Sequence, residues 1–136
     1  MDIGLSIKQL DNEIKKTIDK KFKCYDVTSM QGFVIKFIYN SKKEVVQRDI
    51  EENLSLKRST VSELLSLMEQ KGLINRVKDG RKNNIVLTEK AINIHNEIKL
   101  TIVDIEEKLK KNIKKEELDL FIEISNRMKN NLMEDE

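Results

Sequence analysis

Proline is absent from the 136-residue sequence, and glycine occurs only four times. Because these two residues interrupt helices more than any others, their scarcity permits long continuous helices. Aromatic residues make up only 4% of the chain, so its apolar content consists mainly of Ile and Leu. This composition predicts a mainly helical single chain that is long enough to bury a core.

Cysteine is nearly absent too, because Cys24 is the only one, which excludes a disulfide framework within one chain and a multi-cysteine zinc site. No apolar run approaches the roughly 20 residues of a membrane span, and the N-terminal segment is amphipathic, unlike a signal peptide. We therefore expect a cytoplasmic protein without a membrane partner. An inert, partly buried thiol is the preferred interpretation of Cys24, and an oxidant sensor is the alternative.

Residues with catalytic or metal-binding spacing are missing as well. The sequence has no glycine-rich phosphate loop and no paired nucleophile and base. His95, the only histidine, lies two residues before Glu97, which is poor spacing for two metal ligands on one helix face. The pairs Glu106-Glu107 and Glu116-Glu117 have the character of solvated charges on exposed helices. We predict no enzymatic activity, no cofactor and no metal site.

Apolar residues recur every three or four positions along most of the chain, which predicts amphipathic helices. A Thr28 to Gln31 capping box starts the second of them. The fourth has a buried face of Val61, Leu64, Leu65 and Met68, and Gly72 supplies the residue that ends it. The predicted helices cover residues 3–25, 28–40, 45–52, 57–71, 88–113 and 116–132.

After Gly72 the pattern alternates, with Leu73, Asn75 and Val77 on one side and Ile85 and Leu87 beyond a break. The break, Asp79-Gly80, predicts a two-residue type I′ hairpin flanked by Lys78 and Arg81, since Asp and Gly tolerate the positive φ of that turn. A short helix, a turn, a longer helix and a hairpin form a winged helix-turn-helix. We predict an all-α fold with a small β-wing, in which N- and C-terminal dimerisation helices flank the winged helix-turn-helix.

The formal net charge is only +2, but the charges are unevenly distributed. Residues 42–90 carry 11 Lys and Arg against 8 Asp and Glu, whereas the rest of the chain carries 15 against 16. A basic centre of this kind favours a double-stranded DNA partner. The predicted DNA-binding residues are the outward side of the 57–71 helix and the basic hairpin: Arg58, Ser59, Thr60, Ser62, Glu63, Ser66, Arg76, Lys78, Arg81 and Lys82.

Four segments resemble the MarR family of transcriptional regulators: residues 56–62 (LKRSTVS), 68–76 (MEQKGLINR), 79–81 (DGR) and 86–90 (VLTEK). They look like the family's recognition helix, the exit from that helix, the wing and the entry into the long fifth helix. The sequence departs from the family pattern in three places: Arg76 and Asp79 are unusually close, Ala91 stands where glycine is common, and Lys57 stands where a Ser or Thr cap is common.

The resemblance implies a homodimer that binds a pseudo-palindromic operator as a cytoplasmic regulator, with repression favoured over activation. It divides the chain into dimerisation helices (1–27 and 88–136) and a winged helix-turn-helix (28–87). It also implies a possible small-molecule effector pocket between these regions. For that pocket the candidate walls are Tyr25, Phe33, Phe37 and Tyr39, for which core packing is an equal explanation.

The alternative from another functional class is a winged-helix module that binds a protein partner through the same surfaces and never contacts DNA. Salt dependence separates the two hypotheses, because duplex binding weakens steeply with salt and a mostly apolar protein interface does not.

Overall fold

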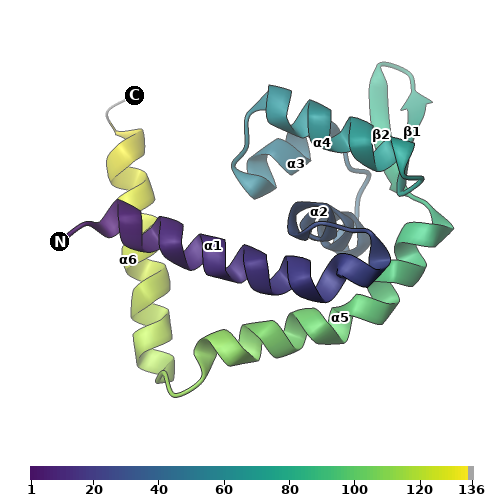
Figure 1. Cartoon of the computed structure of the whole chain (residues 1–136). Helices are drawn as coiled ribbons and strands as arrows, with labels where there is room; N and C mark the ends of the chain where they lie inside the picture. Colours follow the sequence, from purple (N-terminus) through teal and green to yellow (C-terminus); the bar gives the residue numbers. More distant parts are fainter. Residues whose placement is uncertain (135–136) are drawn as a thin grey trace. The chain divides into compact units, whose positions relative to one another are not determined.

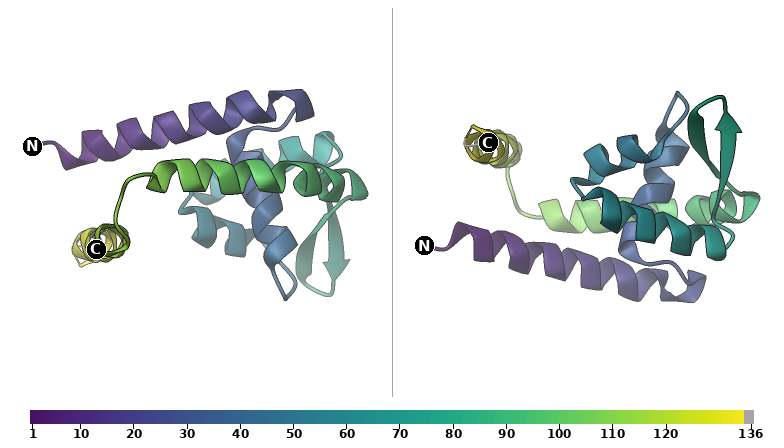
Figure 2. Two further views of the ribbon diagram at one scale, coloured as in Figure 1. Left: turned by 90° about the horizontal axis from the view of Figure 1, so that it is seen from below. Right: turned by 90° about the horizontal axis from the view of Figure 1, so that it is seen from above.

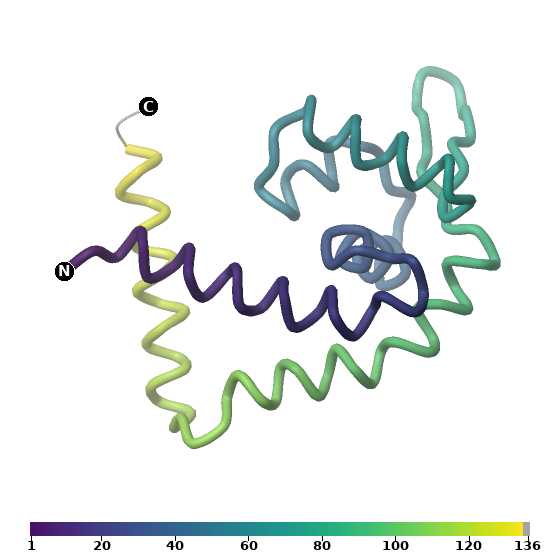
Figure 3. Tube along the Cα trace, in the orientation of Figure 1, coloured from purple at the N-terminus to yellow at the C-terminus, as the bar shows by residue number. Residues whose placement is uncertain are grey.

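The computed structural model describes residues 1–134 and confirms the predicted fold class, with six α-helices and one two-stranded hairpin (Figure 1). It divides into two compact units, residues 1–101 and 102–136. Short connections join successive elements, as the chain trace shows (Figure 3). The elements are α1 (Ile3–Phe22), the 3₁₀ helix η1 (Lys23–Tyr25), α2 (Ser29–Asn40), α3 (Gln47–Leu54), α4 (Arg58–Gln70), β1 (Ile74–Asp79), β2 (Lys82–Leu87), α5 (Glu89–Lys110) and α6 (Lys115–Met133).

The joint between α1 and α2 is a tight turn with side-chain caps. The predicted first helix ends three residues early, because its last turn is the 3₁₀ helix η1, which Asp26 ends in the left-handed region at φ +56°. The predicted capping box is confirmed: the Gln31 amide donates to Thr28 Oγ1 over 3.2 Å, and the Thr28 amide donates to Gln31 Oε1 over 3.1 Å. The N-terminus of α2 is therefore fixed by its own side chains.

The helix pair α3 and α4 forms the helix-turn-helix. Asp49 Oδ2 accepts from the Val46 amide over 2.9 Å and so caps α3, which begins two residues later than predicted. At the end of α4 the Leu73 amide donates to the Met68 carbonyl over 2.9 Å and the Gly72 amide to that of Glu69 over 3.0 Å. These two bonds form a Schellman motif around Gly72, whose φ of +74° confirms its predicted role.

The hairpin differs from the prediction by one residue. Asp79 pairs with Lys82, so the two-residue turn is Gly80-Arg81 and not Asp79-Gly80. Gly80 has a φ of +64°, and no positive φ occurs at Asp79 or Arg81. A positive φ at only the first central residue matches a type II′ turn, for which glycine in that position is sufficient. Asp79 therefore completes β1, and Arg81 lies at the tip.

The core of the first unit lies where α2, α3 and α4 meet the base of the hairpin, with α2 between α1 and the α3–α4 pair (Figure 1). The hairpin extends beyond the helices, beside the α2–α3 connection (Figure 2). Of the predicted α4 face, Val61, Leu65 and Met68 are buried and Leu64 is half-buried. The fully buried side chains include Phe22, Val34, Ile35, Ile50, Val61, Leu65, Met68, Leu73, Ile74 and Ile98.

The alternation of buried and exposed side chains along β1 also differs from the expected one. Leu73 is buried but precedes β1, and Asn75 and Val77 are exposed. Ile74 faces inward and pairs with Leu87, and Arg76, on the same side of the strand, pairs with Ile85.

The C-terminal segment is helical and leaves many apolar side chains uncovered. Thr88 caps α5 as predicted, since its Oγ1 accepts from the Ala91 amide over 3.2 Å. Glu117 Oε1 caps α6 by accepting from the Lys114 amide over 2.9 Å. No residue of α6 is buried within the single chain. Its exposed apolar residues are Leu120, Phe121, Ile122, Ile124, Leu132 and Met133.

Candidate nucleic-acid interface

The side of α4 opposite the core carries short polar side chains. Ser59, Thr60, Glu63 and Ser66 are exposed, because the 3.6-residue period that buries Val61, Leu65 and Met68 turns them outward. Arg58, the first residue of α4, is exposed beside them. The first amides of α4 receive no side-chain cap from Lys57 and remain available to an outside acceptor. This surface has the predicted composition and orientation.

Ser62 differs from its neighbours because its hydroxyl is already engaged. It is half-buried, and Gln47 Nε2, at the start of α3, donates to Ser62 Oγ over 2.8 Å. The same amide lies 3.4 Å from the carbonyl oxygen of Arg58. Gln47 therefore joins α3 to α4 at the outward face. Sequence reasoning missed this residue, because a pair separated by 15 positions leaves no periodic pattern.

The hairpin presents three of its four predicted basic residues. Lys78, Arg81 and Lys82 are exposed, and Arg81 occupies the turn itself. Arg76 is placed differently: its side chain is 28% exposed, and Nε lies 3.7 Å from Glu69 Oε1. Arg76 Nε is buried and lacks a hydrogen-bond partner among the described residues. Its charge is thus partly neutralised and set back from the tip.

A basic cleft of about 680 Å³ lies between α3, the start of α4 and the hairpin. Five cations line it, against the single acid Glu51: Arg48, Arg58, Arg76, Arg81 and Lys82. The folded chain brings together basic residues that lie up to 34 positions apart in the sequence, so their potentials add over one concave surface. Arg48 was not among the predicted DNA-binding residues. It lies on α3 four positions before Glu52, and its Nε is 3.3 Å from Glu52 Oε1.

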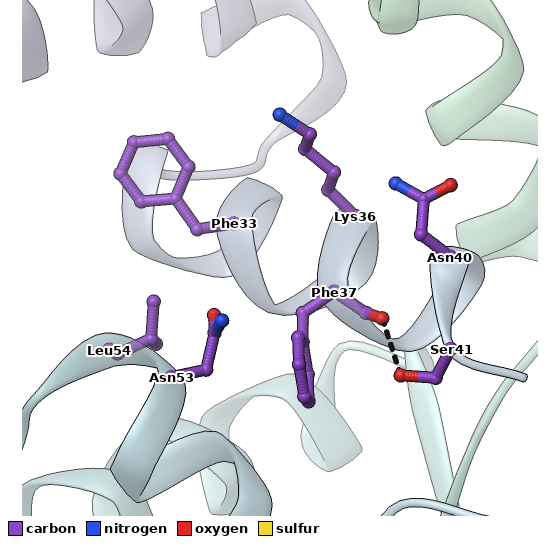
Figure 4. A pocket seen from close by; sticks show the side chains of 7 residues that line it. All are labelled: Phe33, Lys36, Phe37, Asn40, Ser41, Asn53 and Leu54. Carbon is purple, nitrogen blue, oxygen red and sulfur yellow. Dashed lines mark hydrogen bonds between the residues drawn. The ribbon is translucent and has the colours of Figure 1, made fainter. Parts of the chain in front are cut away.

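A smaller cavity of about 360 Å³ adjoins α2 and α3 (Figure 4). Two of the four predicted pocket residues, Phe33 and Phe37, line it together with Lys36, Asn40 and Leu54. Tyr25 and Tyr39 are not among its lining residues. Tyr39 instead packs on His95, with ring centroids 4.1 Å apart. The predicted aromatic cluster is therefore divided between two places.

Solved structures of other proteins have the same fold over nearly the whole chain. The transcription regulator MarR from Oenococcus oeni PSU-1 is 32% identical over 95% of this chain and 99% of its own, with a TM-score of 0.85. The chain belongs to the MarR family of transcription regulators. This membership confirms the resemblance of the four sequence segments.

Other MarR-type structures agree with this assignment. S. aureus MepR, solved as a DNA complex, is 26% identical over 96% of each chain, with a TM-score of 0.88. The transcriptional regulator SlyA shares the fold at 22% identity and a TM-score of 0.85, over 99% of this chain and 96% of its own. Residues 28–88 also match a family model described as "Domain of unknown function (DUF7343)". That segment runs from the α2 cap to the end of the hairpin.

His95 is a buried titratable side chain that packs on Tyr39 of α2 and lies outside the predicted DNA-binding surface. It is 5% exposed, and Nδ1 has no hydrogen-bond partner among the described residues. Burial lowers the pKa of His95, and the positive charges of Lys99 and Lys36 lower it further. At Tyr25, burial raises the pKa of the hydroxyl, with smaller contributions from Cys24 and Glu97.

The remaining predicted features can be placed within residues 1–134. Cys24 is exposed, so the expectation of a partly buried thiol was wrong: η1 turns its side chain away from the core. Over these residues no group of three or more His, Cys, Asp or Glu side chains is arranged to hold a metal ion. No helix within residues 1–134 combines the length and apolar character needed to span a bilayer.

Proposed function

We propose that this MarR-family regulator binds double-stranded DNA as a homodimer and represses transcription by occupying a pseudo-palindromic operator. The observation that carries the proposal is the exposed polar face of α4 beside the basic cleft. A helix fits the major groove, which is roughly 12 Å wide, and small side chains allow close approach to base edges. The solved DNA complex of the relative MepR supports the DNA-binding part of this proposal.

Different residues of this surface suit the two kinds of DNA contact: phosphate contacts, which position the protein, and base contacts, which give specificity. Arg58 and the free amides of the α4 N-terminus are placed for phosphate contact. Thr60 and Glu63 are exposed on α4 and are the candidates for base contact, since a carboxylate can accept from a cytosine N4 amine in the major groove. Arg81, at the hairpin tip, is the candidate for the adjacent minor groove, since a narrow minor groove attracts arginine more than lysine.

The homodimer rests on apolar surface that one chain leaves uncovered. In α1 the side chains of Ile3, Leu5, Ile7 and Leu10 are exposed, and α6 buries none of its apolar residues. A soluble monomer rarely keeps such continuous apolar faces in water. A second copy is the occupant we propose, because it covers both faces in a closed two-fold assembly. Residues 1–27 and 88–136 then form the dimer, and residues 28–87 the DNA-binding region.

The effector is a separate part of the proposal. The α2–α3 cavity combines two phenyl rings with the Lys36 ammonium, which suits a small apolar ligand carrying an acidic group. Saturating the protein with such ligands during a DNA titration tests this part, because an effector weakens operator binding. The protein acts as a regulator without catalytic activity of its own.

The decisive experiment is a salt titration of duplex binding, measured by fluorescence anisotropy with genomic fragments that the protein retains. Duplex binding predicts that log K falls linearly with log salt, by about 0.9 for each phosphate neutralised. The control is a duplex of scrambled sequence, which should bind more weakly at physiological salt. Failure to bind either duplex, or binding that does not depend on salt, would contradict the proposal and favour the protein-interaction module.

A further inference from the structure

The C-terminal end of α4 is connected to the turn between α1 and α2 by one side chain. Lys71 directly follows α4, and its Nζ donates to the Asp26 carbonyl over 2.9 Å and to Gln31 Oε1 over 3.2 Å. The same ammonium lies 3.7 Å from Asp26 Oδ1. A lysine that served only solubility would extend into water, whereas this side chain is 30% exposed and has three acceptors.

The acceptor end of this connection is firmly held. Gln31 is 3% exposed, and its Oε1 also accepts from the Thr28 amide as part of the α2 capping box. The neighbouring Ser29 amide donates to Asp19 Oδ1 of α1 over 2.6 Å. A chain of polar contacts therefore connects α1, the N-terminus of α2 and Lys71, the residue that directly follows α4.

The backbone at the same point is attached to α5. Lys90 Nζ donates to the Lys71 carbonyl over 2.7 Å, and Thr88 Oγ1 donates to the Gly72 carbonyl over 2.6 Å. Both carbonyls would otherwise be unpaired at a helix C-terminus. The end of α4 is thus a junction of three elements, and the Lys71 side chain is its link toward α1.

The orientation of α4 relative to α1 matters if two subunits must place two α4 helices in successive major grooves. We propose that Lys71 is a positioning residue, which holds α4 at a fixed angle to α1 and so raises DNA affinity without contacting DNA. This inference rests on the proposed function, because α1 contributes to the dimer and α4 reads the operator. A charge-assisted hydrogen bond suits the role, since it is stronger and more directional than a neutral one.

The first test is Lys71→Met, which keeps the length and apolar stem but removes the ammonium. We expect operator affinity to fall by about tenfold, within the usual range of coupling between sites. The slope of log K against log salt should stay unchanged, because no phosphate contact is lost. Lys71→Arg should restore most of the affinity, because arginine keeps the positive charge at this position.

The second test needs no DNA. Spin labels at Asn12 of α1 and Ser66 of α4, both exposed, report the distance between these helices in a Cys24→Ser background. Labelled chains diluted with unlabelled ones isolate the distance within one subunit. Lys71→Met should broaden the distance distribution, and Lys71→Arg should keep it narrow.

The outcomes separate this inference from the proposed function. Binding within twofold of wild type together with an unchanged distance distribution overturns the positioning role. If Lys71→Met lowers the magnitude of the slope of log K against log salt by about one, Lys71 contacts a phosphate. That result also overturns the positioning role. If the unsubstituted protein fails to bind any duplex, the proposed function fails, and the distance measurement still decides whether Lys71 holds α4.

Discussion

Replacing Gly32 by alanine should destabilise the joint between α1 and α2. Gly32 lies on α2 against the ring of Phe22, and a Cβ built at this position would lie 2.6 Å from Phe22 Cε2. Ordinary contacts between carbon atoms are about 3.5–4.0 Å. Because Phe22 is 1% exposed and belongs to the core, its ring cannot move away freely. Either the ring must leave its preferred rotamer or α2 must shift away from α1.

The magnitude follows from two opposing effects. Overpacking of a dense core costs about 1–3 kcal/mol, whereas alanine gains about 1 kcal/mol over glycine in helix propensity. We expect a net loss of about 1 kcal/mol, which lowers the midpoint of thermal unfolding by about 3–5 °C for a chain of this size. Circular dichroism measures this shift, with all variants at the same protomer concentration because the midpoint of a dimeric protein depends on it.

Gly4→Ala is the matched control for this prediction. Gly4 is also helical, but its Cβ would meet only Asp2 Oδ1, at 3.8 Å. The substitution should leave stability unchanged or raise it slightly. If Gly32→Ala is as stable as Gly4→Ala, the reasoning about close packing at the α1–α2 joint is refuted.

Three further predictions concern pH, DNA contact and assembly. The pKa of His95 is lowered in the folded state, so the unfolded chain binds more protons as the pH drops below about 6.5. The free energy of unfolding should therefore decrease on acidification, with a slope of at most about 1.4 kcal/mol per pH unit for this one group. His95→Phe should remove that part of the pH dependence in unfolding curves at pH 5–7, and an unchanged curve would contradict it. Arg81→Ala should weaken operator binding by about 1–3 kcal/mol while leaving the melting curve intact, as a titration will test. Phe121→Asp, on the exposed face of α6, should shift the protein toward monomer in analytical ultracentrifugation, and a dimer of undiminished stability would count against the proposed interface.

Helix positions and caps were largely predictable because their causes are local. The Thr28 capping box, the Gly72 helix end and the Thr88 cap each involve residues within five positions. The buried face of α4 followed from its 3.6-residue period. The hairpin turn was misplaced by one residue, because both Asp79-Gly80 and Gly80-Arg81 are acceptable turns and strand pairing decides between them.

The site was less predictable where it depends on contacts between distant residues. The outward face of α4 follows from periodicity, but the Gln47 bond to Ser62 does not. Arg76 lines the basic cleft, but its approach to Glu69 on α4 was not predictable from its charge, because it depends on strand alternation. The inward or outward direction of a strand residue depends on register, which the sequence did not specify to one residue.

Hydroxyl-radical footprinting of the protein on a retained operator tests the central claim most directly. The account predicts two protected half-sites related by a two-fold axis, with centres one helical turn, or roughly 34 Å, apart. Substitution of Thr60 and Glu63 on α4 should abolish the protection without unfolding the chain. A single protected patch, or protection that survives the loss of these α4 side chains, would contradict it.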